Sequence, residues 1–178
     1  MSGDAEIQLA VLSAEEVAAH LGELGALLHA CVHAGASIGF VVPFAPAEAE
    51  AFWRGRVLPA VEAGGRALWV ARTGGRIVGT VQLGHDTMPN QAHRAEVSKL
   101  LVHPLFRRRG IARALMAALE RRARQLGRSL LTLDTRTGDS AEPLYASLGY
   151  RTAGVIPGYC RHPLEDRLEP TTVMYKAL

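Results

Sequence analysis

The chain has 178 residues, of which 48% are hydrophobic and 21% charged, a balance that excludes an intrinsically disordered protein. This length suits one domain over residues 1–178, and a net charge of +3 is compatible with a polyphosphate ligand as well as with nucleic acid. Two cysteines and an acidic start without an apolar core argue against a disulfide framework and secretion, so we expect a cytoplasmic protein.

The N-terminal part of the chain predicts a short strand and two helices. Alternating apolar residues favour a strand over residues 6–12, and residues 13–16 form the capping-box pattern that opens a helix. Apolar residues at spacings of three and four continue that helix to about His33. A second helix is predicted over residues 46–62, with a kink or an end at Pro59.

The middle of the chain predicts a hairpin and a βαβ unit. Strands over residues 66–73 and 76–85 are joined by a Gly-Gly turn. A strand over residues 95–102, a helix over residues 110–126 and a strand over residues 130–135 follow, so the two strands of this unit should be parallel. The last strand is rich enough in leucine to be buried on both faces.

The C-terminal part predicts a helix over residues 140–148 and strands over residues 150–155 and 171–176. The element order is that of an α/β protein whose mixed sheet of about six or seven strands carries helices on both faces. A terminal strand can exchange between subunits, so a homodimer stays open. The uncharged stretch over residues 24–47 contains prolines and glycines that argue against a membrane helix.

The strongest functional signal is the strand-to-helix turn at residues 102–112, Val-His-Pro-Leu-Phe-Arg-Arg-Arg-Gly-Ile-Ala. The first N–H groups of a helix lack backbone partners, and the helix dipole adds positive charge there. Gly110 and Ala112 are small enough for a diphosphate to approach the backbone. A plain basic turn is the alternative, but the strand, the arginines and the following amphipathic helix together favour an anion site.

This turn resembles the acetyl-CoA pyrophosphate loop of the GCN5-related N-acetyltransferases, or GNATs. The family pattern Arg/Gln-x-x-Gly-x-Gly/Ala is filled by Arg107, Gly110 and Ala112. Residues 144–150, Leu-Tyr-Ala-Ser-Leu-Gly-Tyr, resemble the family's second signature, and stretches within residues 27–176 are similar to tabtoxin-resistance acetyltransferase. The resemblance implies transfer of an acetyl group from acetyl-CoA to a primary amine of a small molecule, such as a β-lactam amino acid.

The resemblance also implies where acetyl-CoA binds. The strand over residues 95–102 should splay from the strand over residues 130–135 and open a cleft for the pantetheine arm. Backbone groups near Leu100, Leu101 and Val102 would pair with that arm. The diphosphate would be wrapped by Arg107, Arg108, Arg109, Gly110, Ile111, Ala112 and Arg113.

Three side chains are candidates for proton transfer. The acceptor amine must lose a proton before it attacks, and Glu96 is the first candidate for the base or for a cation-binding group. Asp134 or an ordered water is the alternative base. Tyr145 looks like the family's general acid, which protonates the departing thiolate. Structural roles stay open: Tyr145 can pack in the core, Glu96 can pair with Lys99 or an arginine, and Asp134 can cap a turn.

His33, Ser37 and Phe40 are candidates to line the amine pocket. His29 and His33 share one helix face but lack the glutamate of a His-Glu-x-x-His motif, so no metal site is expected. Gly138 stands where the family often has an asparagine, seven residues before the tyrosine, so only a backbone contact is expected there.

Three other functions stay open on the sequence alone. Acetyl transfer to a protein or peptide amine would use the same chemistry, and a non-catalytic acetyl-CoA sensor would use only the binding site. Nucleic-acid binding would use the arginines of residues 107–128, but no helix-turn-helix, zinc-finger or RNA-binding signature accompanies them. We therefore expect a small-molecule amine as partner and neither nucleic acid nor a membrane.

Overall fold

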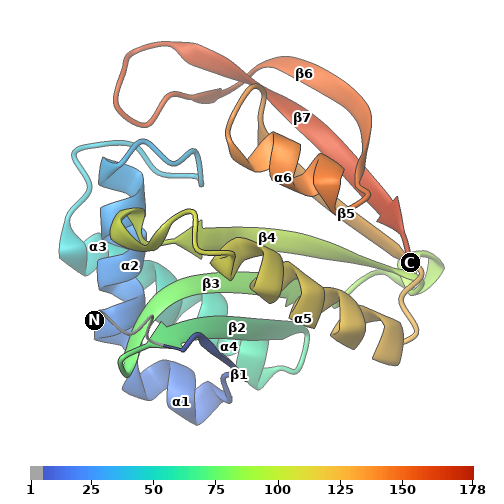
Figure 1. Cartoon of the computed structure of the whole chain (residues 1–178), viewed down its shortest axis with the longest axis horizontal. Helices are drawn as coiled ribbons and strands as arrows, with labels where there is room; N and C mark the ends of the chain where they lie inside the picture. Colours follow the sequence, from blue (N-terminus) through green and yellow to red (C-terminus); the bar gives the residue numbers. More distant parts are fainter. Residues whose placement is uncertain (1–5) are drawn as a thin grey trace.

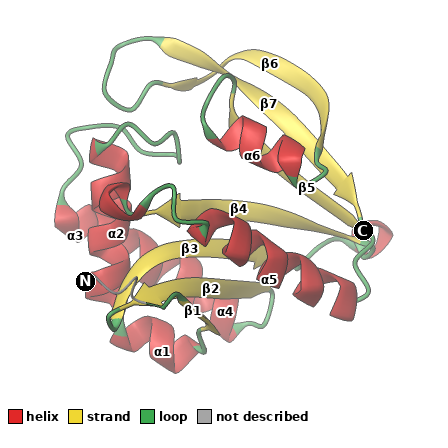
Figure 2. Ribbon diagram, viewed as in Figure 1, coloured by secondary structure: helices red, strands yellow, loops and turns green. Residues whose placement is uncertain are grey.

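The computed structural model describes residues 6–178 and contains one seven-stranded mixed sheet (Figures 1 and 2). The strands are β1 (Gln8–Val11), β2 (Arg66–Thr73), β3 (Arg76–Gly84), β4 (Arg94–Val102), β5 (Leu130–Arg136), β6 (Arg151–Arg161) and β7 (Leu168–Ala177). Their order across the sheet is β1-β2-β3-β4-β5-β7-β6. Neighbouring strands are antiparallel except β4 and β5, which are parallel as predicted for the βαβ unit.

Helices cover both faces of this sheet, as predicted (Figure 2). They are α1 (Ala14–Ala19), α2 (Leu21–His33), α3 (Pro46–Phe52), α4 (Leu58–Glu62), α5 (Ile111–Gln125) and α6 (Ala141–Ser147). One apolar core lies between the sheet and α5, with Tyr145 of α6 at its edge. A second core lies between the sheet and the helices α1 to α4 and includes the fully buried Trp53. No helix within residues 6–178 is long and apolar enough to cross a membrane.

The first helical segment begins as predicted but breaks early. The Ser13 hydroxyl accepts from the Glu16 N–H at 3.2 Å, and the Glu16 carboxylate accepts from the Ser13 N–H at 2.7 Å. The prediction of one helix reaching His33 is wrong, because α1 ends and α2 begins at His20. The His20 N–H is shared between the carbonyls of Glu16 and Val17, which tightens the last turn of α1.

The second predicted helix is also interrupted. A π-helical turn, Trp53–Val57, separates α3 from α4. The Leu58 N–H donates to the Trp53 carbonyl five residues earlier. Pro59 has no N–H to donate, and the wide turn before it lets the chain stay helical through the proline.

The C-terminal hairpin is longer than the sequence predicts. Pairing between β6 and β7 extends to Arg161 and Leu168, whereas the predicted strands are residues 150–155 and 171–176. The sequence Pro157-Gly158 reads as a turn, but the structure accommodates it in an irregular stretch between Ile156 and Cys160. Residues 157–168 therefore form an arm, which lies beyond α6 in Figure 1, while β7 pairs with both β5 and β6 of its own chain.

The sheet opens between β4 and β5. Their parallel pairing stops at Glu96 and Thr132, although β4 continues to Val102 and β5 to Arg136. The expected splay of these strands is therefore present. Because of this opening, β5 buries Leu131 and Leu133 on the α5 side only, and the prediction that it is buried on both faces is wrong.

Candidate active site

The turn after β4 leads into a helix start that no side chain caps within the described residues. Gly110 occupies the N-cap position with φ 77°, a left-handed conformation that favours glycine. A Cβ at Gly110 would have no protein atom within 4 Å, so the space outside this turn is open. Free N–H groups, the positive end of the α5 dipole and open space together suit a diphosphate group.

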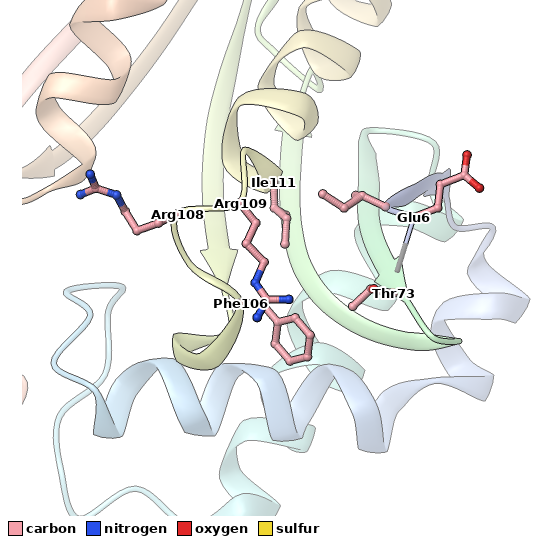
Figure 3. Close-up of a pocket in the computed structure, with 7 residues that line it drawn as sticks. Glu6, Thr73, Phe106, Arg108, Arg109 and Ile111 are labelled. Carbon is pink, nitrogen blue, oxygen red and sulfur yellow. The ribbon is translucent and has the colours of Figure 1, made fainter. Parts of the chain in front are cut away.

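The three predicted arginines of this turn take different directions. Arg107 turns back towards β4, where its Nε donates to the Val102 carbonyl at 3.4 Å. Arg109 lies over the Phe106 ring, with its guanidinium carbon 5.1 Å from the ring centre. The exposed Arg108 points away from both Arg109 and Phe106 (Figure 3). Arg108 is therefore the arginine most free to reach an anion, while Arg107 holds the end of β4.

The first turn of α5 is fixed against β3 and α6. Ile111 is buried against β3 at Gly79, where an added Cβ would lie 2.9 Å from Ile111 Cγ2. Arg113 donates to the Ser147 hydroxyl at 2.7 Å and so ties α5 to α6. Of the predicted diphosphate-binding residues, Ile111 and Ala112 thus offer backbone N–H groups, whereas the Arg113 side chain is already engaged by α6.

A hollow of about 310 Å³ adjoins the same turn (Figure 3). It is lined by Glu6, Ile7, Thr73, Phe106, Arg108, Arg109 and Ile111. One wall comes from the β1 and β2 side of the sheet and the other from the turn and the start of α5, whereas the gap in the sheet lies between β4 and β5. The hollow therefore adds basic surface beside the turn without being part of the gap.

The second half of β4 has an unpaired backbone edge. Within the described residues, β5 does not pair with β4 at Leu100, Leu101 or Val102. The Val102 carbonyl accepts from the Cys31 thiol at 3.5 Å. Burial raises the pKa of that thiol to about 11 despite the nearby Arg107, so Cys31 stays a protonated donor at neutral pH. All three predicted pantetheine-binding residues thus lie on a strand edge that β5 leaves open, but the Val102 carbonyl already accepts from Cys31 and Arg107.

A bulge at Lys99 directly precedes this edge. The register between β3 and β4 shifts between Thr80 and Gln82, which gives β4 an extra residue there. Lys99 has φ 50°, and its carbonyl accepts from the buried Thr80 hydroxyl at 3.0 Å. The Lys99 ammonium lies 5.6 Å from the centre of the Phe52 ring. The bulge therefore directs Lys99 towards the end of α3.

Glu96 and Asp134 lie on the two strands that border the gap, and both are exposed. Asp134 accepts from the Thr171 hydroxyl at 3.0 Å. Burial, and then the Arg66 cation, lower the pKa of Lys99, while Asp134 and Glu96 oppose that shift. Both carboxylates therefore act on the same lysine. Glu96 forms no ion pair with Lys99 or an arginine in the part of the chain that the structure describes, so it stays available to a substrate.

Tyr145 lies on α6 with 6% of its surface exposed. Its ring meets the Tyr150 ring edge-on, with 5.7 Å between the ring centres. Burial raises the pKa of the Tyr145 hydroxyl, and the negative charges of Asp134 and Asp139 raise it further. The hydroxyl is therefore protonated at neutral pH, as in any tyrosine, but the raised pKa makes it a weaker acid than an ordinary phenol.

Phe40, from the loop between α2 and α3, joins a cluster of rings beside Lys99. Its ring lies 4.6 Å from the Phe44 ring and 5.2 Å from the Phe52 ring. Because the Lys99 ammonium lies over Phe52, Phe40 and Lys99 border the same region. The predicted role of Phe40 as a pocket wall is compatible with this position.

The other two predicted pocket residues lie apart from each other. The Ser37 hydroxyl is 3.5 Å from Cys160 Sγ, at the junction with the arm. The exposed His33 keeps its ring on its own helix, with Nδ1 3.0 Å from the His29 carbonyl. The two histidine rings lie 4.0 Å apart, and the described residues contain no cluster of three or more metal-ligating side chains.

The loop between α2 and α3 is bonded to the opposite half of the sheet. The Val42 N–H donates to the Pro163 carbonyl of the arm at 2.9 Å. Arg136 of β5 donates to the Gly35 carbonyl at 3.2 Å and pairs with Glu169 at 3.3 Å. We call these contacts the loop–arm bridge, and they join the loop that carries Phe40 to β5 and to the arm.

The family model described as the acetyltransferase (GNAT) family matches residues 24–150. The chain belongs to the GNAT family. A GNAT relative from Azospirillum brasilense, named as an uncharacterized N-acetyltransferase in the hisH-hisA intergenic region, is 39% identical over 114 residues. This match covers 63% of the present chain and 66% of that protein, just under two thirds of its length.

Solved structures share the GNAT fold over nearly the whole chain. An N-acetyltransferase from Staphylococcus aureus Mu50 superposes with a TM-score of 0.78 at 16% identity, covering 97% of this chain and 99% of the other. A protein from Salmonella typhimurium, described provisionally as an acetyltransferase and solved with its cofactor acetyl-CoA, gives 0.75 at 19% identity, covering 98% and 95%. At these identities the similarity shows the fold.

The sequence patterns do not single out Lys99, Arg66 and Gln82, which lie on β4, β2 and β3 on the side of the sheet that faces α2 and α3. A lysine within an apolar strand is the one signal that could have drawn attention to this place. The bulge that directs Lys99, and the cross-strand position of Gln82 opposite Ser98, depend on tertiary pairing. Both are therefore visible only in the folded chain.

Proposed function

We propose that this GNAT-family chain transfers the acetyl group of acetyl-CoA to a primary amine of a small molecule. The main support is that β4 parts from β5 after Glu96, which leaves one edge of β4 without a partner strand within the described residues. That edge leads to the uncapped start of α5. This combination fits a ligand with an extended amide-containing arm and a diphosphate. The edge would pair with the arm, and the α5 N–H groups with Arg108 would hold the diphosphate.

Acetyl-CoA would supply the acetyl group in activated form, as a thioester. The residues of the chain would manage the protons. Glu96, or Asp134 across the gap, attracts the ammonium form of the acceptor and takes its proton directly or through water. Tyr145, held protonated by burial and by nearby carboxylates, donates a proton to the leaving sulfur. N–H groups on the unpaired β4 edge are available to stabilise negative charge on the carbonyl oxygen.

A small acceptor is favoured over a protein amine by the loop–arm bridge, which restricts the approach to the acceptor side of the gap. The similarity of residues 27–176 to tabtoxin-resistance acetyltransferase supports an amino-acid-like acceptor and a role in resistance to a toxic amine. The homodimer that the sequence leaves open is to be tested by light scattering.

The test is thiol release from acetyl-CoA with a panel of amines: amino acids, polyamines, aminoglycosides and short peptides. We expect turnover with one class of small amine and no competition by peptides. Acetyl-CoA binding without thiol release from any amine would instead support a sensor. Release only with peptides or proteins would reassign the acceptor class.

A further inference from the structure

Two buried side-chain N–H groups, of Gln82 and Arg66, have no hydrogen-bond acceptor within the described residues. Both lie on the side of the sheet where the proposed acceptor amine would bind. Gln82 is fully buried on β3, and its Oε1 accepts from Arg66 Nη1 at 2.8 Å. That bond fixes the orientation of the amide, so Gln82 Nε2 is a donor, and it has no partner among the described residues. Arg66 Nε is likewise buried without a partner in the part of the chain that is described. Buried donors are rarely left unpaired, so these two call for an explanation.

Both side chains face the helices α2 and α3. Gln82 pairs across the ladder with Leu68 of β2, and residues directly opposite each other share one face of a sheet. Leu68 belongs to the core formed with α2, α3 and Trp53. The donors therefore lie on the same side as Phe52 and Lys99.

Lys99 completes the cluster. Its neighbour Ser98 is the β4 partner of Gln82, and Gln82 is bonded to Arg66, whose charge also acts on Lys99. Its ammonium lies over the Phe52 ring, and such a cation–π contact is stronger where water is excluded. Neither Lys99 nor Arg66 forms an ion pair within residues 6–178. Two part-buried cations therefore act on each other without an ion-pair partner within the described residues, and the charges of Asp134 and Glu96 compensate Lys99 only in part.

We propose that Lys99, Arg66 and Gln82 form an oxyanion-binding subsite in the acceptor half of the cleft, and that the preferred acceptor carries a carboxylate besides its amine. This inference rests on the proposed function and names the acceptor class. Glu96 and Asp134 would hold the ammonium end of the acceptor, and the three donors would hold its carboxylate end. The alternation of charge across the gap thus matches a compact zwitterion such as an amino acid.

The charge pattern also explains why a simple amine is a poorer match. An acceptor without an anion would leave the cations repelling each other and the Gln82 amide unpaired. An acceptor carboxylate would satisfy these groups through charge-assisted hydrogen bonds, which are the stronger kind. The site should therefore reject acceptors without a carboxylate, because they leave its buried donors and cations unpaired.

The test compares matched acceptors that differ by one carboxylate: L-serine with ethanolamine, L-lysine with cadaverine, and L-phenylalanine with phenethylamine. 2-Aminoethylphosphonate against ethylamine tests the other common oxyanion. Wild type, Lys99→Met, Lys99→Arg and the control Arg121→Met, which removes an exposed charge of α5, are measured by thiol release. Binding of the acceptors alone is measured by calorimetry.

We expect wild type to prefer the carboxylate member of the accepted pair. Lys99→Met should lower kcat/KM for that member by about 10- to 100-fold and change the carboxylate-free member by less than about threefold. Lys99→Arg should keep most of the preference, and Arg121→Met all of it. If the preference for 2-aminoethylphosphonate over ethylamine exceeded that for any carboxylate, the oxyanion subsite would be supported and its preferred anion would be a phosphonate.

Two results would overturn the inference while leaving the proposed function intact. Wild type could turn over both members of every pair equally, or Lys99→Met could depress both members by the same factor, as expected of a base or a structural lysine. Absence of thiol release from every amine, with acetyl-CoA bound, would instead contradict the proposed function. Calorimetry separates that case, because it measures acceptor binding without turnover. Binding that depends on the carboxylate and is lost in Lys99→Met would support the subsite even if no amine were acetylated.

Discussion

Tyr145 is the residue whose chemistry depends most clearly on its surroundings. Burial, and then the charges of Asp134 and Asp139, raise the pKa of its phenol, so the hydroxyl gives up its proton less readily than that of an ordinary tyrosine. We predict that Tyr145→Phe lowers kcat by about 100-fold, because general acid catalysis is lost while the ring still fills its place. Affinity for acetyl-CoA should stay within about twofold, measured by calorimetry. Unchanged turnover would show that the hydroxyl only packs.

Gly110 permits a second test at the level of one residue. Glutamate there would have no clash within the protein, and the φ of 77° would destabilise the fold by about 1–2 kcal/mol. Its carboxylate would, however, occupy the space of the diphosphate and repel it. We predict that Gly110→Glu weakens acetyl-CoA binding by at least about 100-fold.

Gly127 offers a matched control for that variant. It has φ 70°, no protein atom within 4 Å of an added Cβ, and a position at the other end of α5. Gly127→Glu should therefore carry a similar conformational strain and leave acetyl-CoA affinity unchanged. If both variants lost binding equally, strain in α5 rather than the diphosphate site would be the cause.

Lys99 leads to a pH prediction. Burial and Arg66 lower its pKa, although Asp134 and Glu96 oppose the shift, so the ammonium form is lost at a lower pH than in an ordinary lysine. Only that form attracts a carboxylate, so the preference for carboxylate acceptors should fall as the pH rises towards about 10. The ratio of kcat/KM values within a matched pair measures it. In Lys99→Arg this ratio should stay constant over the same pH range. If the ratio changed with pH in the same way in wild type and Lys99→Arg, the result would argue against the subsite.

At the scale of elements, local signals predicted the structure well where local energetics decide it. The hairpin of β2 and β3 follows from its Gly-Gly turn, and α5 follows from its apolar periodicity and its flanking glycines. The break at His20, the π turn before Pro59 and the bulge at Lys99 were missed. These depend on how each segment packs against another, which a local pattern does not encode.

The site divides in the same way. The uncapped helix start at Gly110 could be predicted from the sequence because glycine marks its left-handed backbone geometry, and its binding of an anion stays a prediction. The parting of β4 from β5 came from family resemblance, since the leucine-rich β5 alone indicated burial on both faces. The proposed subsite at Lys99, Arg66 and Gln82 joins three strands, and its one sequence signal is a lysine within an apolar strand.

The contact between β3 and α5 provides a prediction for an element. A Cβ at Gly79 would lie 2.9 Å from Ile111 Cγ2 and 3.0 Å from the Leu101 carbonyl oxygen. Gly79→Ala should therefore displace the start of α5, lower the free energy of unfolding by about 1–3 kcal/mol and weaken acetyl-CoA binding. Urea denaturation and calorimetry measure the two effects.

Gly84 lies on the same strand and serves as the control. The nearest atom to a Cβ there is the Glu96 carbonyl oxygen at 3.9 Å, an ordinary contact. Gly84→Ala should therefore change neither stability nor acetyl-CoA affinity appreciably. A Gly79→Ala protein that matched it in both measurements would show that α5 can shift without loss of the site.

On the scale of the whole molecule, the sheet consists of two halves with a narrow connection. Within residues 6–178, the ladder between the β1–β4 half and the half containing β5, β7 and β6 has three paired positions, from Arg94 to Glu96. Helix α5 and the loop–arm bridge supply further links across the gap. A ligand lying between β4 and β5 would therefore bind both halves and add to their cohesion.

This connection predicts a large stabilisation by acetyl-CoA. At a ligand concentration of about 100 Kd the folded state gains about 2.7 kcal/mol, which raises the Tm of a chain of this size by about 5–10 °C. Hydrogen exchange should slow at backbone amides of β4 beyond Glu96, where β5 offers no partner. Gly110→Glu should abolish both effects and Gly127→Glu neither. A rise in Tm with protection confined to other segments would place the ligand outside the gap, because pairing along the open edge must protect those amides.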